Sequence, residues 1–94
     1  MVGDMQVLFF ATLREITRKP EIRWMAPTAN VGELLHALCR RYGPEFQKWA
    51  FNGDNLSDII IVLVNGHDVR HAAGMATSLS PDDTVAVFPM VAGG

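Results

Sequence analysis

An α+β roll, with one helix lying across one side of a β-sheet, is predicted by two features of the sequence. Residues 31–42 place apolar side chains at helical spacing, whereas several shorter apolar segments have the β-branched and aromatic composition of strands. The order of these segments is strand, strand, helix, strand, strand, strand. The expected strands are residues 5–10, 21–26, 58–64, 67–71 and 84–90.

The first two strands are expected to form an antiparallel hairpin. The segment "MQVLFF" (5–10) is strongly apolar, and apolar and polar residues alternate through "EIRWMA" (21–26). Residues 11–20 between them are polar and end in proline, so we expect a connecting loop. Within this loop Arg14 and Glu15 are expected to be an exposed pair, although contact with a partner is the alternative.

The helix at 31–42 has recognisable start and stop signals. Asn30 can accept a hydrogen bond from the first turn, and Glu33 can reach back in a capping-box-like arrangement. Gly43 and Pro44 then end the helix. The apolar stripe that should face the sheet consists of Val31, Leu34, Leu35, Leu38, Cys39 and Tyr42.

The second half of the chain is less uniform. Residues 45–58 combine helical spacing with the turn-like sequence "NGDN", and their structure is left open. The following run "DIIIVLV" has no polar face, and Asn65-Gly66 predicts a tight turn into a short strand at 67–71. A second turn is expected at Ser80–Asp83, directly before the last strand.

Both terminal strands are apolar on both faces, yet only one long helix is available to cover them. Residues expected to face the helix are Val7, Phe9, Val85 and Val87. Residues expected to face outward are Leu8, Phe10, Ala86 and Phe88. If these two strands are neighbours, the outward set forms an apolar patch of the kind that marks an interface. The alternative is that 45–58 folds back over this face.

Composition narrows the function classes. The chain has 94 residues, which suits one domain over 1–94. Its net charge of −2 gives no basic surface for nucleic acid, and its longest apolar run is too short to cross a bilayer. The one cysteine, Cys39, rules out an internal disulfide framework and fits a reducing compartment, so a cytoplasmic location is expected.

Other titratable residues give no convincing site. His67 and His71 would lie about 13 Å apart on an extended strand, too far to share a metal ion with Asp68, so a solvated loop and no metal are expected. His36 lies off the apolar stripe and should be exposed. Cys39 lies on the stripe and should be an inert packing residue.

The sequence ends on "FPMVAGG", and this segment suggests an exposed C-terminus that takes part in the function. Pro89 is expected to end the last strand and direct a flexible tail, residues 91–94. That tail extends at most about 13 Å, enough to enter a narrow channel. Because Gly93 and Gly94 have no side chains, other groups can approach their backbone closely.

Four segments together resemble the MoaD/ThiS family of ubiquitin-like sulfur carriers, and most closely the small subunit of molybdopterin synthase. They are "VLFFATLRE", "NVGELLHALCRRYG", "VLVNG" and "LSPDDTVAVFPMVAGG", of which the Gly-Gly after an apolar strand and proline is the most specific. The resemblance implies a β-grasp fold, in which a mixed sheet of about five strands packs on one main helix. It also implies that the first and last strands are adjacent and parallel.

The resemblance implies sulfur transfer rather than a catalytic site of this chain's own. In that family the terminal carboxylate, here on Gly94, is adenylated with ATP by a ubiquitin-activating-like (MoeB-like) adenylyltransferase. A sulfur donor protein then supplies the sulfur of a thiocarboxylate. With a MoaE-like large subunit, the carrier delivers that sulfur to a pterin precursor. No bound cofactor is expected.

The resemblance implies that Gly94, together with Gly93, carries the sulfur. The residues expected to bind partners are Leu8, Phe10 and Phe88, from the outward-facing apolar set, and Pro89, Met90, Val91 and Ala92, which lead into and form the tail. Met90 stands where MoaD-type tails have a second proline. Sulfur carriage for thiamine or cysteine synthesis therefore remains open. So do modification of protein lysines through the same terminus and an adaptor role with an inert tail.

Overall fold

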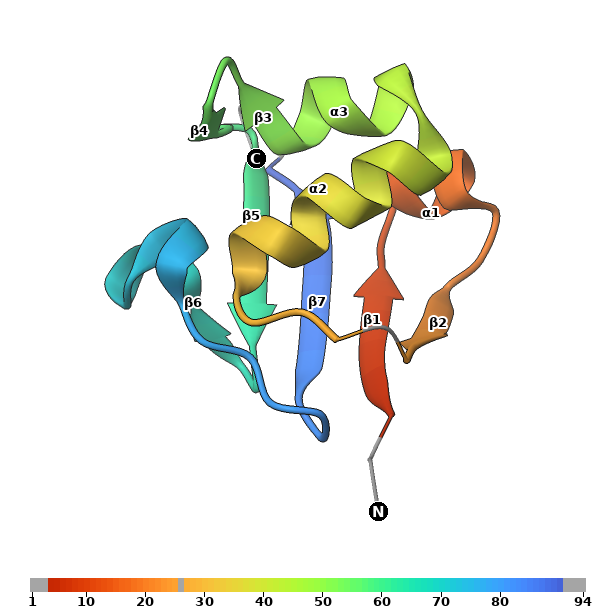
Figure 1. The fold of residues 1–94 in the computed structure, drawn as a ribbon. Coiled ribbons are helices and arrows are strands. Elements are labelled where there is room, and N and C mark those ends of the chain that lie inside the picture. The colour runs from red at the N-terminus through yellow and green to blue at the C-terminus, as the bar shows by residue number, and fades with distance from the viewer. Residues whose placement is uncertain (1–3, 26, 91–94) are drawn as a thin grey trace.

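The computed structural model describes residues 4–25 and 27–90, and a five-stranded sheet lies at its centre (Figure 1). The strands of this sheet are β1 (Met5–Phe9), β2 (Glu21–Trp24), β5 (Ile60–Val64), β6 (His67–Asp68) and β7 (Thr84–Pro89). Their spatial order is β2-β1-β7-β5-β6. The strands expected from the sequence are therefore all present, although β6 is shorter than predicted.

The two central strands, β1 and β7, run parallel, with Val7 opposite Val85 and Phe9 opposite Val87. Strand β2 pairs antiparallel with β1, and β5 pairs antiparallel with β7. A mixed sheet with the first and last strands parallel at its centre and a long helix across one face is the ubiquitin-like β-grasp fold. The expected fold class is confirmed.

Helix α2 (Val31–Tyr42) covers the inner face of the sheet, and its leucines are fully buried. Asn30 caps it, because its side-chain oxygen accepts a 2.9 Å hydrogen bond from the Glu33 N–H. The Glu33 carboxylate reaches back one residue farther than expected and accepts from the Ala29 N–H at 2.9 Å. Gly43, with φ 90°, ends the helix as predicted.

The expected loop at 11–20 is wrong, because helix α1 (Thr12–Thr17) forms there. Ala11 and Arg18 bound it with φ values of 52° and 65°. Leu13 is fully buried in the core, and burial of this side chain stabilises a helix that is too short to form alone. The strand pairing expected between 5–10 and 21–26 is nevertheless correct.

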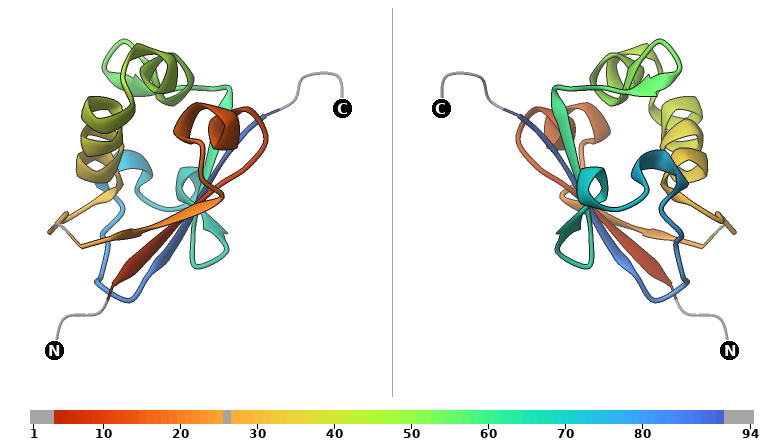
Figure 2. Two further views of the ribbon diagram at one scale, coloured as in Figure 1. Left: turned by 90° about the vertical axis from the view of Figure 1, so that its right-hand side faces the viewer. Right: turned by 90° about the vertical axis from the view of Figure 1, so that its left-hand side faces the viewer.

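Residues 44–56, mostly left open by the sequence, form helix α3 (Pro44–Ala50) and the small hairpin of β3 (Phe51–Asn52) and β4 (Asn55–Leu56). Phe46 of α3 is fully buried and meets Phe9 edge-on, with ring centroids 6.1 Å apart. The segment therefore completes the inner core. Figure 2 shows α2 and α3 on the same side of the sheet, so the idea that 45–58 covers the outer face is wrong.

Both predicted turns are present. Asn65 and Gly66 have φ values of 51° and 85°, as a two-residue hairpin turn requires, and they join β5 to β6. The chain then forms two short 3-10 helices, η1 (Val69–His71) and η2 (Gly74–Ala76). Before β7, the Ser80–Asp83 turn is closed by a 3.1 Å hydrogen bond from the Asp83 N–H to the Ser80 carbonyl.

We predict that Phe46→Ala lowers the free energy of unfolding by about 3–5 kcal/mol, because it leaves a cavity beside Phe9 and Tyr42. Urea denaturation followed by circular dichroism measures the change. Gln47→Ala, an exposed change in the same helix, is the matched control and should stay near the wild-type value. Equal effects of the two changes would contradict this assignment of the core.

Candidate functional site

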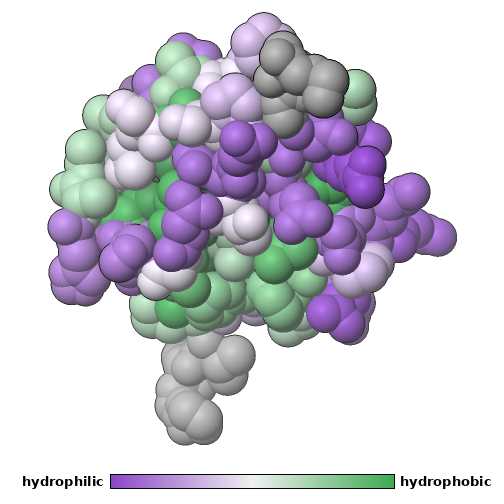
Figure 3. Space-filling model, turned by 90° about the horizontal axis from the view of Figure 1, so that it is seen from below, coloured by the Kyte–Doolittle hydropathy of each residue, from purple (hydrophilic) through white to green (hydrophobic). Residues whose placement is uncertain are grey.

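The outer face of the sheet is apolar and is not covered by any helix that the structure describes. Figure 3 shows hydrophobic side chains gathered over the lower half of the view, on the side of the sheet away from the helices. We call this surface the apolar sheet face. Its members alternate with buried core residues along three strands and their ends: Leu8, Phe10, Ile59, Ile61, Leu63, Ala86, Phe88 and Met90.

Two aromatic residues stand at the end of this face where β1 and β7 stop. Phe10 and Phe88 meet edge-on, with ring centroids 5.8 Å apart and planes at 88°. The guanidinium carbon of Arg14 lies 5.8 Å from the Phe10 ring centroid, and Arg14 Nε donates to the Phe9 carbonyl at 3.3 Å. A cation thus borders the aromatic pair.

Pro89 lies at the one place in β7 where a missing N–H breaks no pairing. Successive N–H groups of a strand point to opposite neighbours. The Met90 N–H donates to the Ile59 carbonyl on the β5 side at 2.8 Å, so position 89 faces the β1 side. There β1 has ended, and the Phe10 carbonyl instead accepts from the Leu13 and Arg14 N–H groups of α1.

The predicted partner-binding residues divide into three groups. Phe10 and Met90 are 39% and 46% exposed, and Leu8 and Phe88 are half-buried, so all four are accessible. Pro89 is buried, and its side chain does not belong to the apolar sheet face; its contact with a partner stays a prediction. It does end β7, as predicted. The remaining residues, Val91, Ala92, Gly93 and Gly94, lie outside the described residues.

Sequence reasoning missed three residues of this face, and it considered Arg14 only as one of an exposed pair, with contact with a partner as the alternative. Ile59, Ile61 and Leu63 extend it onto β5, and Ile59 is 48% exposed. The sequence did contain a signal for these residues. In a strand that is apolar at every position, alternate side chains form an apolar outer face as well as an apolar inner face. Arg14 was placed in a loop. Its place above Phe10 follows from the helical turn that was not predicted.

The other residues considered from the sequence have local structural roles. Asp68 caps η1 by accepting from the Arg70 N–H at 2.9 Å. His36 is exposed and stacks on Phe51, with ring centroids 4.4 Å apart. Cys39 is half-buried, and burial raises the pKa of its thiol, an effect that the charge of Arg40 partly offsets. A raised pKa keeps this thiol protonated and weakly nucleophilic at neutral pH.

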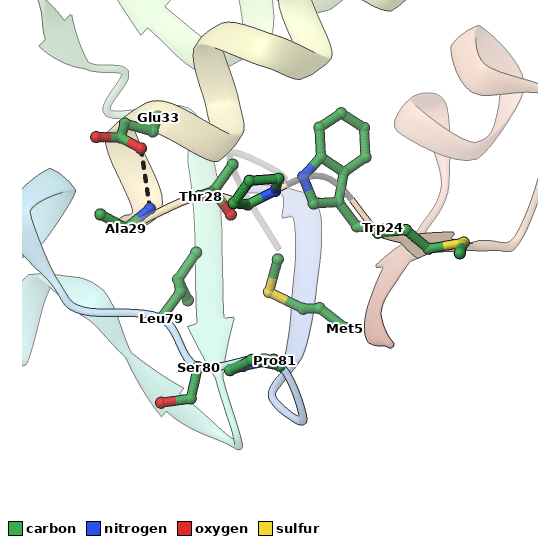
Figure 4. A pocket seen from close by; sticks show the side chains of 10 residues that line it. Met5, Trp24, Thr28, Ala29, Glu33, Leu79, Ser80 and Pro81 are labelled. Atoms are coloured by element: carbon green, nitrogen blue, oxygen red, sulfur yellow. Dashed lines mark hydrogen bonds between the residues drawn. The ribbon is translucent and has the colours of Figure 1, made fainter. Parts of the chain in front are cut away.

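A separate pocket of about 540 Å³ opens at the other end of the central strands (Figure 4). Met5 at the start of β1, Trp24 at the end of β2, and Leu79 before β7 contribute to its walls. Since β1 and β7 are parallel, their starts lie at the opposite end of the sheet from Phe10 and Phe88. The pocket is therefore not continuous with the aromatic end of the apolar sheet face.

The comparison with known protein families decides the identity of this fold. A family model described as "ThiS family" matches residues 7–94, nearly the whole chain. The chain belongs to the ThiS family. It is thus a ubiquitin-like protein in a family of sulfur carriers and small protein modifiers. In the described part of this ThiS-family chain, none of the helices could reach across a bilayer.

Several relatives match this ThiS-family chain along their full length. The chain is 38% identical to small archaeal modifier protein 3 of Haloferax volcanii, over 97% of this chain and 99% of the relative. Small archaeal modifier protein 1 of Methanosarcina acetivorans has a solution structure that matches with TM-score 0.82 and 29% identity, over 100% and 99% of the two chains. A crystal structure of the Amycolatopsis orientalis BexX/CysO complex matches with TM-score 0.81 and 27% identity, over 96% and 99%.

We predict that alkaline pH destabilises the wild type more than a Cys39→Ala variant. The thiol pKa is higher in the folded chain than in the unfolded one, so the unfolded state loses this proton first. The stability that the protonated thiol gives is complete below the unfolded pKa, about 8.5, and is lost as pH rises through the folded value.

Urea denaturation at pH 7 and at several values above pH 8.5 measures this difference. Other groups that titrate at alkaline pH contribute to both proteins and cancel in the comparison. Parallel stability profiles for wild type and Cys39→Ala would show that burial does not perturb this thiol.

Proposed function

We propose that this chain is a sulfur carrier whose Gly94 carboxylate is converted to a thiocarboxylate. The observation that supports this most directly is the ThiS-family match, which extends through the Gly93-Gly94 pair. The apolar sheet face supports it too, because Phe10 and Phe88 lie beside the end of β7, from which residues 91–94 continue.

The proposed chemistry explains why other proteins are needed. A carboxylate is a poor electrophile, so one of its oxygens first attacks the α-phosphate of ATP and pyrophosphate leaves. A hydrosulfide equivalent from a sulfur donor protein then attacks the acyl carbon. AMP leaves with the carboxylate oxygen, and the thiocarboxylate remains. The chain supplies the carbonyl, and the activating enzyme supplies ATP and the catalytic groups.

The apolar sheet face is the proposed docking surface for these partners. Fixing a glycine-rich tail in a channel costs conformational entropy, so contacts elsewhere must compensate. Burying apolar area is worth about 25 cal/mol per Å², and aromatic residues commonly contribute most of the binding energy. Phe10, Phe88 and Met90 offer such contacts next to the tail, and Arg14 adds a positive charge for a partner carboxylate.

For the final acceptor, we propose a role as the small subunit of a molybdopterin synthase with a MoaE-like large subunit, activated by a MoeB-like adenylyltransferase in the cytoplasm. The support is the resemblance of the strand, proline and Gly-Gly ending to that branch. Met90 in place of a second proline keeps carriers for thiamine or cysteine synthesis as alternatives.

A second candidate function is protein modification, and the relatives favour it. Two of the similar proteins are small archaeal modifier proteins. The same acyl adenylate can react with a lysine amine of a target, so that an isopeptide bond forms and AMP leaves. Carrier and modifier share the activation step and differ in the nucleophile that follows.

We predict that incubation with ATP, a cognate activating enzyme and a sulfur donor raises the intact mass by the difference between sulfur and oxygen. A variant with one bulky residue added after Gly94 should gain nothing, because the added side chain blocks the activating site. An unchanged wild-type mass under these conditions would refute sulfur carriage. High-mass conjugates that disappear in Gly94→Ala would instead identify the modifier function.

We also predict that Phe10→Ser weakens binding to the activating enzyme by about tenfold or more, as is typical for loss of a central aromatic contact. The fold should persist, since Phe10 is 39% exposed. Met25→Ser is the matched control, because Met25 is 72% exposed but lies at the pocket end of the sheet. Titration calorimetry measures both, and equal affinities for a folded Phe10→Ser and wild type would exclude this face as the docking surface.

A further inference from the structure

The geometry points to Arg70 as a positioning residue that fixes the main chain at Met90, the last described residue before the tail. This inference rests on the proposed function, in which the tail is the working end. Arg70 lies in η1, far from Gly94 in sequence, and is not part of the apolar sheet face. Its role follows from the hydrogen bonds that join it to the strand beside Met90.

Arg70 holds the turn that leads into β5 by two backbone carbonyls. Its Nη1 donates to the Ile60 carbonyl at 2.7 Å, and its Nη2 donates to the Ser57 carbonyl. The planar guanidinium can span two acceptors at once, which an ammonium group cannot do with the same geometry. The main chain on either side of Asp58 and Ile59 is thus tied to one side chain.

The same turn is held from inside by Ser57. This serine is only 4% exposed, and its Oγ accepts a 3.1 Å hydrogen bond from the Ile59 N–H. The Ser57 N–H itself donates to the Ala50 carbonyl at the end of α3 at 2.9 Å. Ile59 is therefore fixed between Ser57 and Ile60, although its own side chain is 48% exposed.

Ile59 in turn holds the base of the tail. Its carbonyl accepts from the Met90 N–H at 2.8 Å, the last backbone hydrogen bond that the structure describes before residue 91. Pro89 can donate nothing on the opposite side, so among the described residues this bond is the last one that orients the main chain at Met90. A path of hydrogen bonds thus runs from Arg70 through Ser57, Ile60 and Ile59 to Met90.

Arg70 is itself held in place. Asp68 accepts from its backbone N–H at 2.9 Å, and the neighbouring Val69 is fully buried in the core. The guanidinium therefore extends from an anchored backbone rather than from a mobile loop. A fixed donor lowers the entropy that would be lost in holding the turn, and it raises the fraction of molecules in which the main chain at Met90 keeps one direction.

The test compares Arg70→Met and Arg70→Lys with wild type by amide hydrogen exchange. We expect the Met90 amide to exchange about tenfold faster or more in Arg70→Met, because hydrogen bonds from a charged donor are among the stronger ones. Arg70→Lys should fall between, since lysine keeps the charge but not the fork. Val62 and Val87 in the strand interiors should be unaffected, and Arg23→Met, which removes an exposed arginine bound to Asp4, is the control.

Activation kinetics give the second measurement. If the main chain at Met90 samples more directions in the variant, the competent direction is populated less often, so the KM for adenylation should rise while kcat stays near wild type. An unchanged Met90 exchange rate in a folded Arg70→Met would overturn the inference, as would equal acceleration of every amide. If wild type is not adenylated at all, the proposed function fails, whereas the exchange experiment still decides the role of Arg70.

Discussion

The parallel pairing of β1 with β7 is the contact on which the remaining structure depends. It joins the first and last strands, so the core closes only when almost the whole chain is in place. It also places the carboxyl ends of β1 and β7 side by side at the same end of the sheet. Phe10 and Phe88, which are 78 positions apart in sequence, become neighbours there without either having to leave a strand-like path.

The same pairing separates the two faces of the molecule. Val7, Phe9, Val85 and Val87 point toward the helices and are fully buried, while their neighbours along the strands point away. Helices α1, α2 and α3 add buried side chains to the inner face only. Apolar residues on the outer face are not needed to close the core, which is why we attribute them to binding rather than to stability.

Much of this arrangement could be predicted from local patterns. The α2 stripe, the Asn30 cap, the Asn65-Gly66 turn and the inward and outward sets of the central strands follow from periodicity and capping chemistry. These features depend on residues close in sequence, or on the alternation of side chains along a strand, which is the same whatever the order of the strands. The prediction that β1 and β7 are adjacent and parallel rested on the family resemblance.

Helix α1 could not be predicted in the same way, because its stability depends on Leu13 reaching a core formed by distant segments. The 44–56 region had the same difficulty, since Phe46 belongs to the core only once Phe9 and Tyr42 surround it. The contacts of Arg70 lay beyond sequence reasoning altogether. They are made to main-chain carbonyls, and because every residue has one, the sequence does not show which carbonyls accept these bonds.

The position of Pro89 has a consequence for self-association. Where β1 ends at Phe9, the last residues of β7 no longer have a strand beside them on that side, and a strand margin without a neighbouring strand can template pairing with another chain. Here helix α1 packs against β7 and Pro89 is buried, so the margin is already partly covered. An incoming strand needs a donor at that point, and proline has none. Proline at this position therefore disfavours pairing of β7 with a strand of a second copy, although an exposed aromatic surface lies next to this margin.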